Sequence, residues 1–116
     1  MLNPLFKFWL PVLAYAVLIF GISSIPGSNI PSAFPYADYI FHIIEYFVFG
    51  FLICLAIKNT KTGLSLKKVF LFGIILVMLY AATDEFHQSF VPGRDASFLD
   101  WLCDSAGAMG GIILAL

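Results

Sequence analysis

The sequence predicts an all-α integral membrane protein, built as a bundle of four helices. Of its 116 residues, 61% are hydrophobic and only 11% are charged, and the mean hydropathy is +0.97. A soluble domain is usually about 45–50% apolar and about 25% charged, and so short a chain cannot bury this much apolar surface. The charge is also too sparse for a disordered chain. Because no segment shows the two-residue alternation of a barrel strand, helices are the expected spanning elements.

Four apolar segments supply the predicted spans, at about 5–25, 39–57, 69–87 and 99–116, all within a single domain covering 1–116. A helix needs about 20 apolar residues to cross a hydrocarbon core about 30 Å thick, and the first two segments satisfy this. The third segment has only 15 residues before Asp84, so we expect its helix to continue through Glu85 and His87. The fourth segment carries two acids.

The first segment has a second interpretation, as a cleaved signal peptide, because Lys7 precedes an apolar run that ends in small residues. The apolar part of a signal peptide is about 7–15 residues long and is followed by a small-residue cleavage site. This run is longer and has no clear site of that kind. A retained helix is therefore the favoured interpretation.

The lysines predict the orientation of the bundle. Four lysines lie between residues 58 and 68, and Lys7 precedes the first span. Lys and Arg concentrate in cytoplasmic loops of membrane proteins. The sequence therefore predicts that both termini are cytoplasmic and that the loops at 23–38 and 84–98 lie outside.

The acids were not used in that argument, yet all seven fall at the predicted outer ends of the last three spans or in the loop before the fourth. Both histidines and Arg94 share this location. Asp38, His42 and Glu45 have the i, i+4, i+7 spacing of one helical face. Ionisable groups within a span are costly and usually face a bundle interior or a water-filled cavity.

The third and fourth helices are expected to contribute to the same place. Asp84, His87 and Gln88 share one face of the third, with Glu85 rotated by about 100°. Along the fourth helix one face carries Asp100, Asp104, Gly107 and Gly111. We therefore predict one outward-opening polar pocket to which three helices contribute. In this pocket we expect His42 to lie closest to Asp84 or Glu85.

Several motifs follow one another along the chain: Ser23-Ser24-Ile25-Pro26, Asp38 and His42 with Glu45-Tyr46, Asp84-Glu85-Phe86-His87-Gln88, Val91-Pro92-Gly93-Arg94, and Asp100 and Asp104 followed by Gly107. Together they resemble the VanZ-like family of bacterial membrane proteins. The resemblance covers nearly the whole chain, and 84–94 is its most specific part. It implies a four-span protein of the bacterial plasma membrane. The namesake of the family is associated with resistance to the glycopeptide antibiotic teicoplanin.

Two classes of function fit these features. In the first, the pocket binds an envelope lipid, a lipid-linked cell-wall precursor or a glycopeptide antibiotic, with Ser24, Asp38, Gln88, Arg94, Asp100 and Asp104 as ligand-binding candidates. In the second, the protein is a membrane-embedded hydrolase or phosphatase acting on a lipid-linked substrate. Its catalytic candidates are His42, Glu45, Asp84, Glu85 and His87.

Each candidate group also has an alternative role. The acids and histidines could instead form a hydrogen-bond network between helices. At Asp84, Glu85 and His87 a divalent metal is a candidate cofactor, because carboxylates with imidazole suit Zn²⁺ or Mn²⁺ and carboxylates with water suit Mg²⁺. Arg94 could grip a phosphate or carboxylate, or could balance the surrounding acids. Catalysis by Ser23 or Ser24 is a weaker variant, because neither has a visible base at fixed spacing.

The remaining features concern packing and partners. Gly107 and Gly111 form a G-x-x-x-G motif, which favours close packing inside the bundle over a homodimer face, although a dimer is compatible with it. Cys54 and Cys103 lie near opposite ends of their spans, too far apart for a disulfide. No stripe of Lys and Arg suggests nucleic-acid binding.

Overall fold

The computed structural model describes residues 3–29 and 35–116, and all regular structure in these ranges is helical. Its elements are α1 (Pro4–Ser23), the 3-10 turn η1 (Gly27–Asn29), α2 (Ala37–Thr60), α3 (Leu66–Gln88) and α4 (Phe98–Ala115). All four α-helices are long and apolar enough to cross a membrane, which confirms the predicted fold class. The side of the membrane on which the termini lie stays a prediction.

Local chemistry sets where α1 and α4 begin. The Asn3 side chain accepts a hydrogen bond from the Leu5 N–H, ahead of a helix that starts with proline. Ser97 caps α4 in the same way, accepting from the N–H of Asp100 at 2.9 Å. Such side chains satisfy backbone donors that have no partner within the helix. Helix α3 ends at Gln88, which confirms the prediction that the third helix continues through Glu85 and His87.

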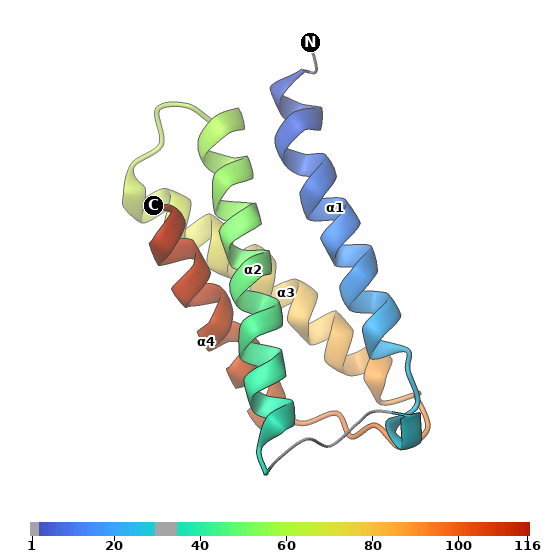
Figure 1. Cartoon of the computed structure of the whole chain (residues 1–116). Helices are drawn as coiled ribbons and strands as arrows, with labels where there is room; N and C mark the ends of the chain where they lie inside the picture. The colour runs from blue at the N-terminus through green and yellow to red at the C-terminus, as the bar shows by residue number, and fades with distance from the viewer. Residues whose placement is uncertain (1–2, 30–34) are drawn as a thin grey trace.

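The other three helices pack against α2, with α1 and α4 on opposite sides of it (Figure 1). The contact between α2 and α4 is one of backbone against backbone. A Cβ atom added to Gly107 would lie 2.2 Å from the carbonyl oxygen of Ile43, and one added to Gly111 would lie 1.9 Å from that of Phe47. The G-x-x-x-G motif therefore packs within the bundle, as predicted.

The outer faces of the bundle are covered by large apolar side chains. Val17 is 70% exposed, and Leu79 and Ile113 are 62% and 58% exposed. A soluble monomer rarely presents so extensive an apolar surface, whereas the hydrocarbon of a bilayer accepts it without cost. Exposed apolar faces and helix lengths thus agree on a membrane setting.

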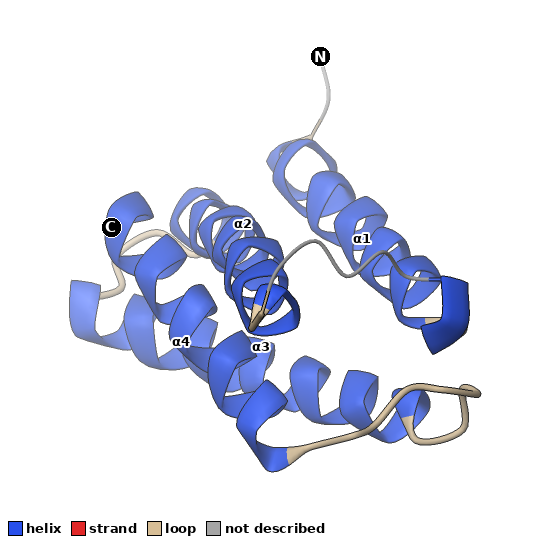
Figure 2. Cartoon of the chain, turned by 60° about the horizontal axis from the view of Figure 1, so that its bottom comes forward, coloured by secondary structure: helices blue, strands red, loops and turns tan. Residues whose placement is uncertain are grey.

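Two loops meet at the end of the bundle that comes forward in Figure 2. The chain from Val91 to Arg94 makes a turn in which the Arg94 N–H donates to the Val91 carbonyl at 3.1 Å. Gly93 has a φ of 76° there, which glycine adopts without steric strain. The Gly27 N–H donates to the Pro92 carbonyl at 2.9 Å. The Pro92-Gly93 turn thus joins the α3–α4 loop to the segment after α1.

Candidate functional site

Helices α1 and α3 end, and α2 and α4 begin, at the same end of the bundle (Figure 1). The acids and histidines of the chain lie towards this end. The polar side chains there fall into three groups with different partners. We call them the buried network (Ser23, Tyr46, Asp84, Gln88), the carboxylate–histidine cluster (His42, Glu85, Asp100, Asp104) and the surface pair (Ser24, His87).

The buried network is centred on Asp84, which is 4% exposed. One Asp84 oxygen accepts a hydrogen bond from the Ser23 hydroxyl, and the other accepts one from the Tyr46 hydroxyl at 2.9 Å. Gln88 donates to the Ser23 hydroxyl oxygen at 3.2 Å. Both carboxylate oxygens of Asp84 are thus engaged with donors from two other helices. In this arrangement Asp84 joins α1, α2 and α3.

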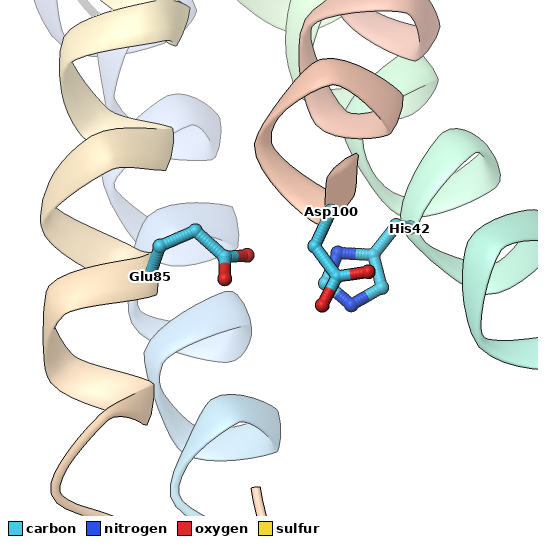
Figure 3. Close-up of side chains that lie close together, drawn as sticks. All are labelled: His42, Glu85 and Asp100. Carbon is cyan, nitrogen blue, oxygen red and sulfur yellow. The ribbon is translucent and has the colours of Figure 1, made fainter. Parts of the chain in front are cut away.

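The carboxylate–histidine cluster is formed by residues of α2, α3 and α4. His42 Nδ1 and Asp104 Oδ1 are 2.6 Å apart, and Asp104 is fully buried. A ring nitrogen of His42 and one carboxylate oxygen each of Glu85 and Asp100 lie within 4.8 Å of one another. Figure 3 shows the three side chains converging from α2, α3 and α4. The second oxygen of Glu85, Oε2, accepts from the Ser97 N–H at 3.2 Å.

The prediction that His42 lies closest to Asp84 or Glu85 is wrong, because its nearest carboxylate is that of Asp104. The reason is the glycine contact between α2 and α4. With no side chain at Gly107, the two backbones touch next to Ile43, and this brings the neighbouring His42 and Asp104 together. In the described part of the chain, no glycine brings the backbones of α2 and α3 together in this way.

The surface pair has the composition of a hydrolase dyad but not its hydrogen bonding. Ser24 Oγ lies 2.9 Å from His87 Nε2, and the His87 ring stacks on Phe20 with centroids 4.2 Å apart. The Ser24 hydroxyl donates to the Phe20 carbonyl at 2.8 Å. With its one proton used there, Ser24 accepts from an Nε2–H of His87. The pair therefore links the end of α1 to α3.

Arg94 holds the end of α1. Its Nε donates to the Ile25 carbonyl at 3.0 Å, and Nη2 donates to the Ile22 carbonyl at 2.8 Å. Within residues 3–29 and 35–116 the single ion pair is His42–Asp104, so Arg94 makes no direct pair with an acid. Arg94 therefore anchors the end of α1, and its side chain also borders the cavities described next.

A cavity of about 660 Å³ opens at this end of the bundle. A second, of about 430 Å³, lies towards α1 and contains Glu45 in its wall. Both are bordered by Asp38, His42, Gln88 and Arg94. The remaining wall of the larger cavity consists of Gly27, Pro35, Tyr36, Ala37, Tyr39, Gly93, Asp95, Ser97 and Asp100.

The structure therefore brings some predicted site residues together and separates others. Asp38, His42, Glu45, Gln88, Arg94 and Asp100 line the two cavities. Asp104 contacts His42 and Glu85 lies near it, but neither residue lines these two cavities. Asp84, Ser24 and His87 line neither cavity. The residues predicted for one pocket are therefore divided between two adjoining cavities and the buried network, and Gln88 belongs to both.

This arrangement coincides with the segments that carried the sequence resemblance, and comparison with known proteins agrees. The sequence matches VanZ/LLP1 over residues 6–116. The chain belongs to the VanZ/LLP1 family. Neither the curated proteins nor the solved structures include a match to it.

Some residues of this VanZ/LLP1 site were missed by sequence reasoning. Ser97 caps α4 and also donates its N–H to Glu85. Its position three residues before Asp100 is the pattern of a helix N-cap and could have located it. Tyr36 and Tyr39 line the larger cavity, and their rings stack with centroids 6.2 Å apart. No sequence signal distinguishes these two tyrosines from ordinary interfacial ones.

Proposed function

We propose that this VanZ/LLP1 protein binds the polar head group of an amphiphile of the bacterial cell envelope, and that this binding underlies a role in glycopeptide resistance. The observation that carries the proposal is the cavity of about 660 Å³ at the loop-bearing end of the bundle. A site of this volume is in the range of small-molecule pockets, which place a few polar groups in a shaped hollow. Membership of the family supports a membrane protein linked to resistance.

The chemistry of the cavity wall indicates which head groups it suits. Asp38, Asp95 and Asp100 supply three carboxylates against the one guanidinium of Arg94. Ligands with amino or hydroxyl groups would find acceptors there, and the rings of Tyr36 and Tyr39 offer flat surfaces for a sugar. Glycopeptides and lipid-linked cell-wall precursors both carry such groups, as do some envelope lipids.

An apolar groove next to the cavity supports an amphiphile rather than a purely polar ligand. It has a volume of about 520 Å³, lies between α3 and α4, and is bordered by Phe86, Phe98 and Trp101. Ser97 borders both the groove and the cavity. A ligand with its head group in the cavity could therefore leave an acyl chain along this groove, facing the lipid.

The proposal is tested by titrating the full chain in lipid nanodiscs with teicoplanin in one arm and with a lipid-linked cell-wall precursor in the other. We expect saturable binding in at least one of the two arms. In that arm the double variant Asp38→Asn with Asp95→Asn should bind at least about tenfold more weakly, or ~1.4 kcal/mol. The control is Lys61→Gln at the opposite end, which should bind as the parent does. Absence of saturable binding in both arms would refute the proposal.

A membrane-embedded hydrolase acting on a lipid-linked phosphate or ester is the second candidate. It is favoured by the His42–Asp104 pair, since a carboxylate that holds Nδ1 leaves Nε2 free to take a proton from water. His42 borders the cavity, so a bound ester would lie beside it. Release of phosphate from a lipid-linked precursor by the purified protein, lost in His42→Gln but kept in His87→Gln, would establish this activity. No release by the parent would exclude it for that substrate.

A further inference from the structure

The carboxylate–histidine cluster has features that neither ligand binding by the cavity nor a structural role explains. Glu85 is 7% exposed, and its Oε1 has no hydrogen-bond partner within the described part of the chain. Asp104 is fully buried and its Oδ2 is likewise unpartnered. A buried carboxylate oxygen without a partner costs free energy, because it has lost its hydration without replacement. The unpartnered oxygen of Glu85, beside His42 and Asp100, calls for a positively charged occupant.

The direction of the side chains shows where that occupant would sit. In Figure 3 the Glu85 carboxylate points from α3 towards Asp100 and the imidazole of His42. One ligand atom from each of these three residues lies within 4.8 Å of the others. Atoms that all bind one metal ion at about 2.0–2.2 Å are separated by roughly 3–4 Å, so only small side-chain movements would close the set.

The remaining carboxylate of the cluster, Asp104, fixes the orientation of the His42 ring. With Nδ1–H held by Asp104 Oδ1 at 2.6 Å, the lone pair of neutral His42 resides on Nε2. A metal-binding histidine commonly gives its other N–H to a carboxylate in this way, which fixes the ring and increases its basicity. An ion pair with protonated His42 would neutralise only one of the three carboxylates.

We propose that His42, Glu85 and Asp100 bind a divalent transition-metal ion, Zn²⁺ or Mn²⁺, with Asp104 as the residue that positions His42. One imidazole and two carboxylates suit these ions better than Mg²⁺ or Ca²⁺, which take oxygen ligands. Three protein ligands leave a coordination position open, as in catalytic rather than structural sites. Because His42 and Asp100 border the cavity, that position faces the bound ligand.

The ligand set differs from the one the sequence alone made plausible. Asp84 and His87 share a helical face with each other, but that face meets α1, and both are engaged there with serines. Only Glu85 of that stretch reaches the cluster. A metal ion at this place would also make the local charge beside the cavity positive. The acidic wall could then accept a phosphate or carboxylate through the ion.

The test uses the full chain without a polyhistidine tag, stripped with a chelator and kept in detergent. Calorimetric titration with Zn²⁺ should give one site per chain, and Co²⁺ should give the visible absorption bands of a nitrogen and oxygen ligand set. We expect Glu85→Gln and Asp100→Asn to weaken Zn²⁺ binding by more than about tenfold, and Asp104→Asn by about 10–100-fold, as for partners of metal-bound histidines.

Two matched controls belong to the same experiment. Asp95→Asn removes an exposed acid from the same cavity, and His87→Gln removes the other histidine of the chain. Both should bind Zn²⁺ as the parent does. Zn²⁺ should also raise the melting temperature of the parent and of the controls but not that of Glu85→Gln, since a ligand stabilises the folded state it binds.

A parent protein that binds no Zn²⁺ and no Mn²⁺, or controls that lose as much affinity as Glu85→Gln, would overturn the metal site. Asp100 is only half-buried, so Asp100→Asn keeps the test decisive where Glu85→Gln fails to fold. The titration contains no amphiphile, so its failure leaves the proposed ligand binding intact. Conversely, metal binding without amphiphile binding would refute the proposed function and not the metal site.

Discussion

Asp84 and Glu85 are neighbours in the sequence, but their carboxylates lie in opposite surroundings. One residue along a helix turns the side chain by about 100°. Here Asp84 faces Ser23 and Tyr46, whereas Glu85 faces His42 and Asp100. Asp84 accepts from Ser23 and Tyr46 with its two oxygens. Glu85 has one oxygen on the Ser97 N–H and the other without a partner in the described chain. The same carboxylate chemistry therefore joins helices at one position and leaves an oxygen for the proposed metal ion at the next.

Asp84→Ala should destabilise the protein, because it leaves the buried hydroxyls of Ser23 and Tyr46 without their acceptor. Each buried donor left unpaired costs about 1–3 kcal/mol. The expected result is a loss of about 2 kcal/mol or more in the free energy of unfolding, measured by denaturant titration in mixed micelles. Asp95→Ala, at an exposed loop position, should change it by less than about 0.5 kcal/mol. Equal stability of the two variants would show that the network does not hold the helices.

Arg94→Lys should loosen the end of α1. The guanidinium reaches the carbonyls of Ile22 and Ile25 with two separate N–H groups, and a lysine ammonium cannot reproduce that fork. A hydrogen bond from a charged group contributes about 1.5–3 kcal/mol. We expect backbone amides in residues 20–27 to exchange with solvent at least about tenfold faster, by hydrogen-exchange mass spectrometry. Protection equal to that of the parent would show that the charge alone suffices.

The elements that decide the geometry of the cluster are α2 and α4. Glycine on each helix allows the backbones to touch: a Cβ on Gly50 would lie 2.3 Å from the Ala108 carbonyl oxygen, as close as those on Gly107 and Gly111 to α2. Small residues at helix interfaces permit this approach inside membranes, where van der Waals packing is a main source of association. The contact carries Asp104 to His42 and so assembles the cluster.

Gly111→Ala should separate these two helices, because the new methyl group would lie 1.9 Å from the Phe47 carbonyl oxygen. Overpacking of this kind costs typically about 1–3 kcal/mol, and the expected readout is a lower melting temperature with weaker Zn²⁺ binding. The control is Gly21→Ala, where nothing lies within 4 Å. That change should leave the melting temperature equal or higher, since alanine favours a helix by about 1 kcal/mol over glycine. A loss in the control as large as that in Gly111→Ala would contradict the argument.

The two ends of the whole molecule differ in chemistry. All the acids, both histidines and Arg94 lie towards the end with the cavities, and the other end carries the lysines of the α2–α3 loop and of the helix ends beside it. There Lys58 donates to the Ala115 carbonyl at 2.9 Å, which suits the negative end of the α4 dipole. An asymmetric distribution of this kind gives the bundle a preferred orientation in the membrane.

Cysteine labelling in intact cells tests that orientation. In a background with Cys54→Ala and Cys103→Ala, we expect an impermeant thiol reagent to label Ala96→Cys in the α3–α4 loop and not Thr62→Cys in the α2–α3 loop. Both positions are exposed, so accessibility alone does not favour either. Permeabilised cells provide the control, in which both should react. Labelling of position 62 but not 96 in intact cells would invert the orientation and place the cavity on the cytoplasmic side.

The sequence by itself determined the class of fold, the number of spanning helices and the end at which the polar residues meet. Span length, sparse charge and helical spacing are properties of the chain within a bilayer, and they hold whichever helices become neighbours. The spacing also predicted correctly that Asp84, His87 and Gln88 share a face that Glu85 does not. The Pro92-Gly93 turn was predictable for the same reason, since its chemistry is local.

Only the tertiary structure decided which polar groups became partners. Spacing along one helix does not say which other helix a face will meet, and the backbone contact at Gly107 settled this by bringing Asp104 rather than Asp84 to His42. Arg94 reached the end of α1 because two loops far apart in the sequence lie side by side. The candidate metal site arises in the same way, since its three ligands come from three helices whose neighbours are chosen by packing.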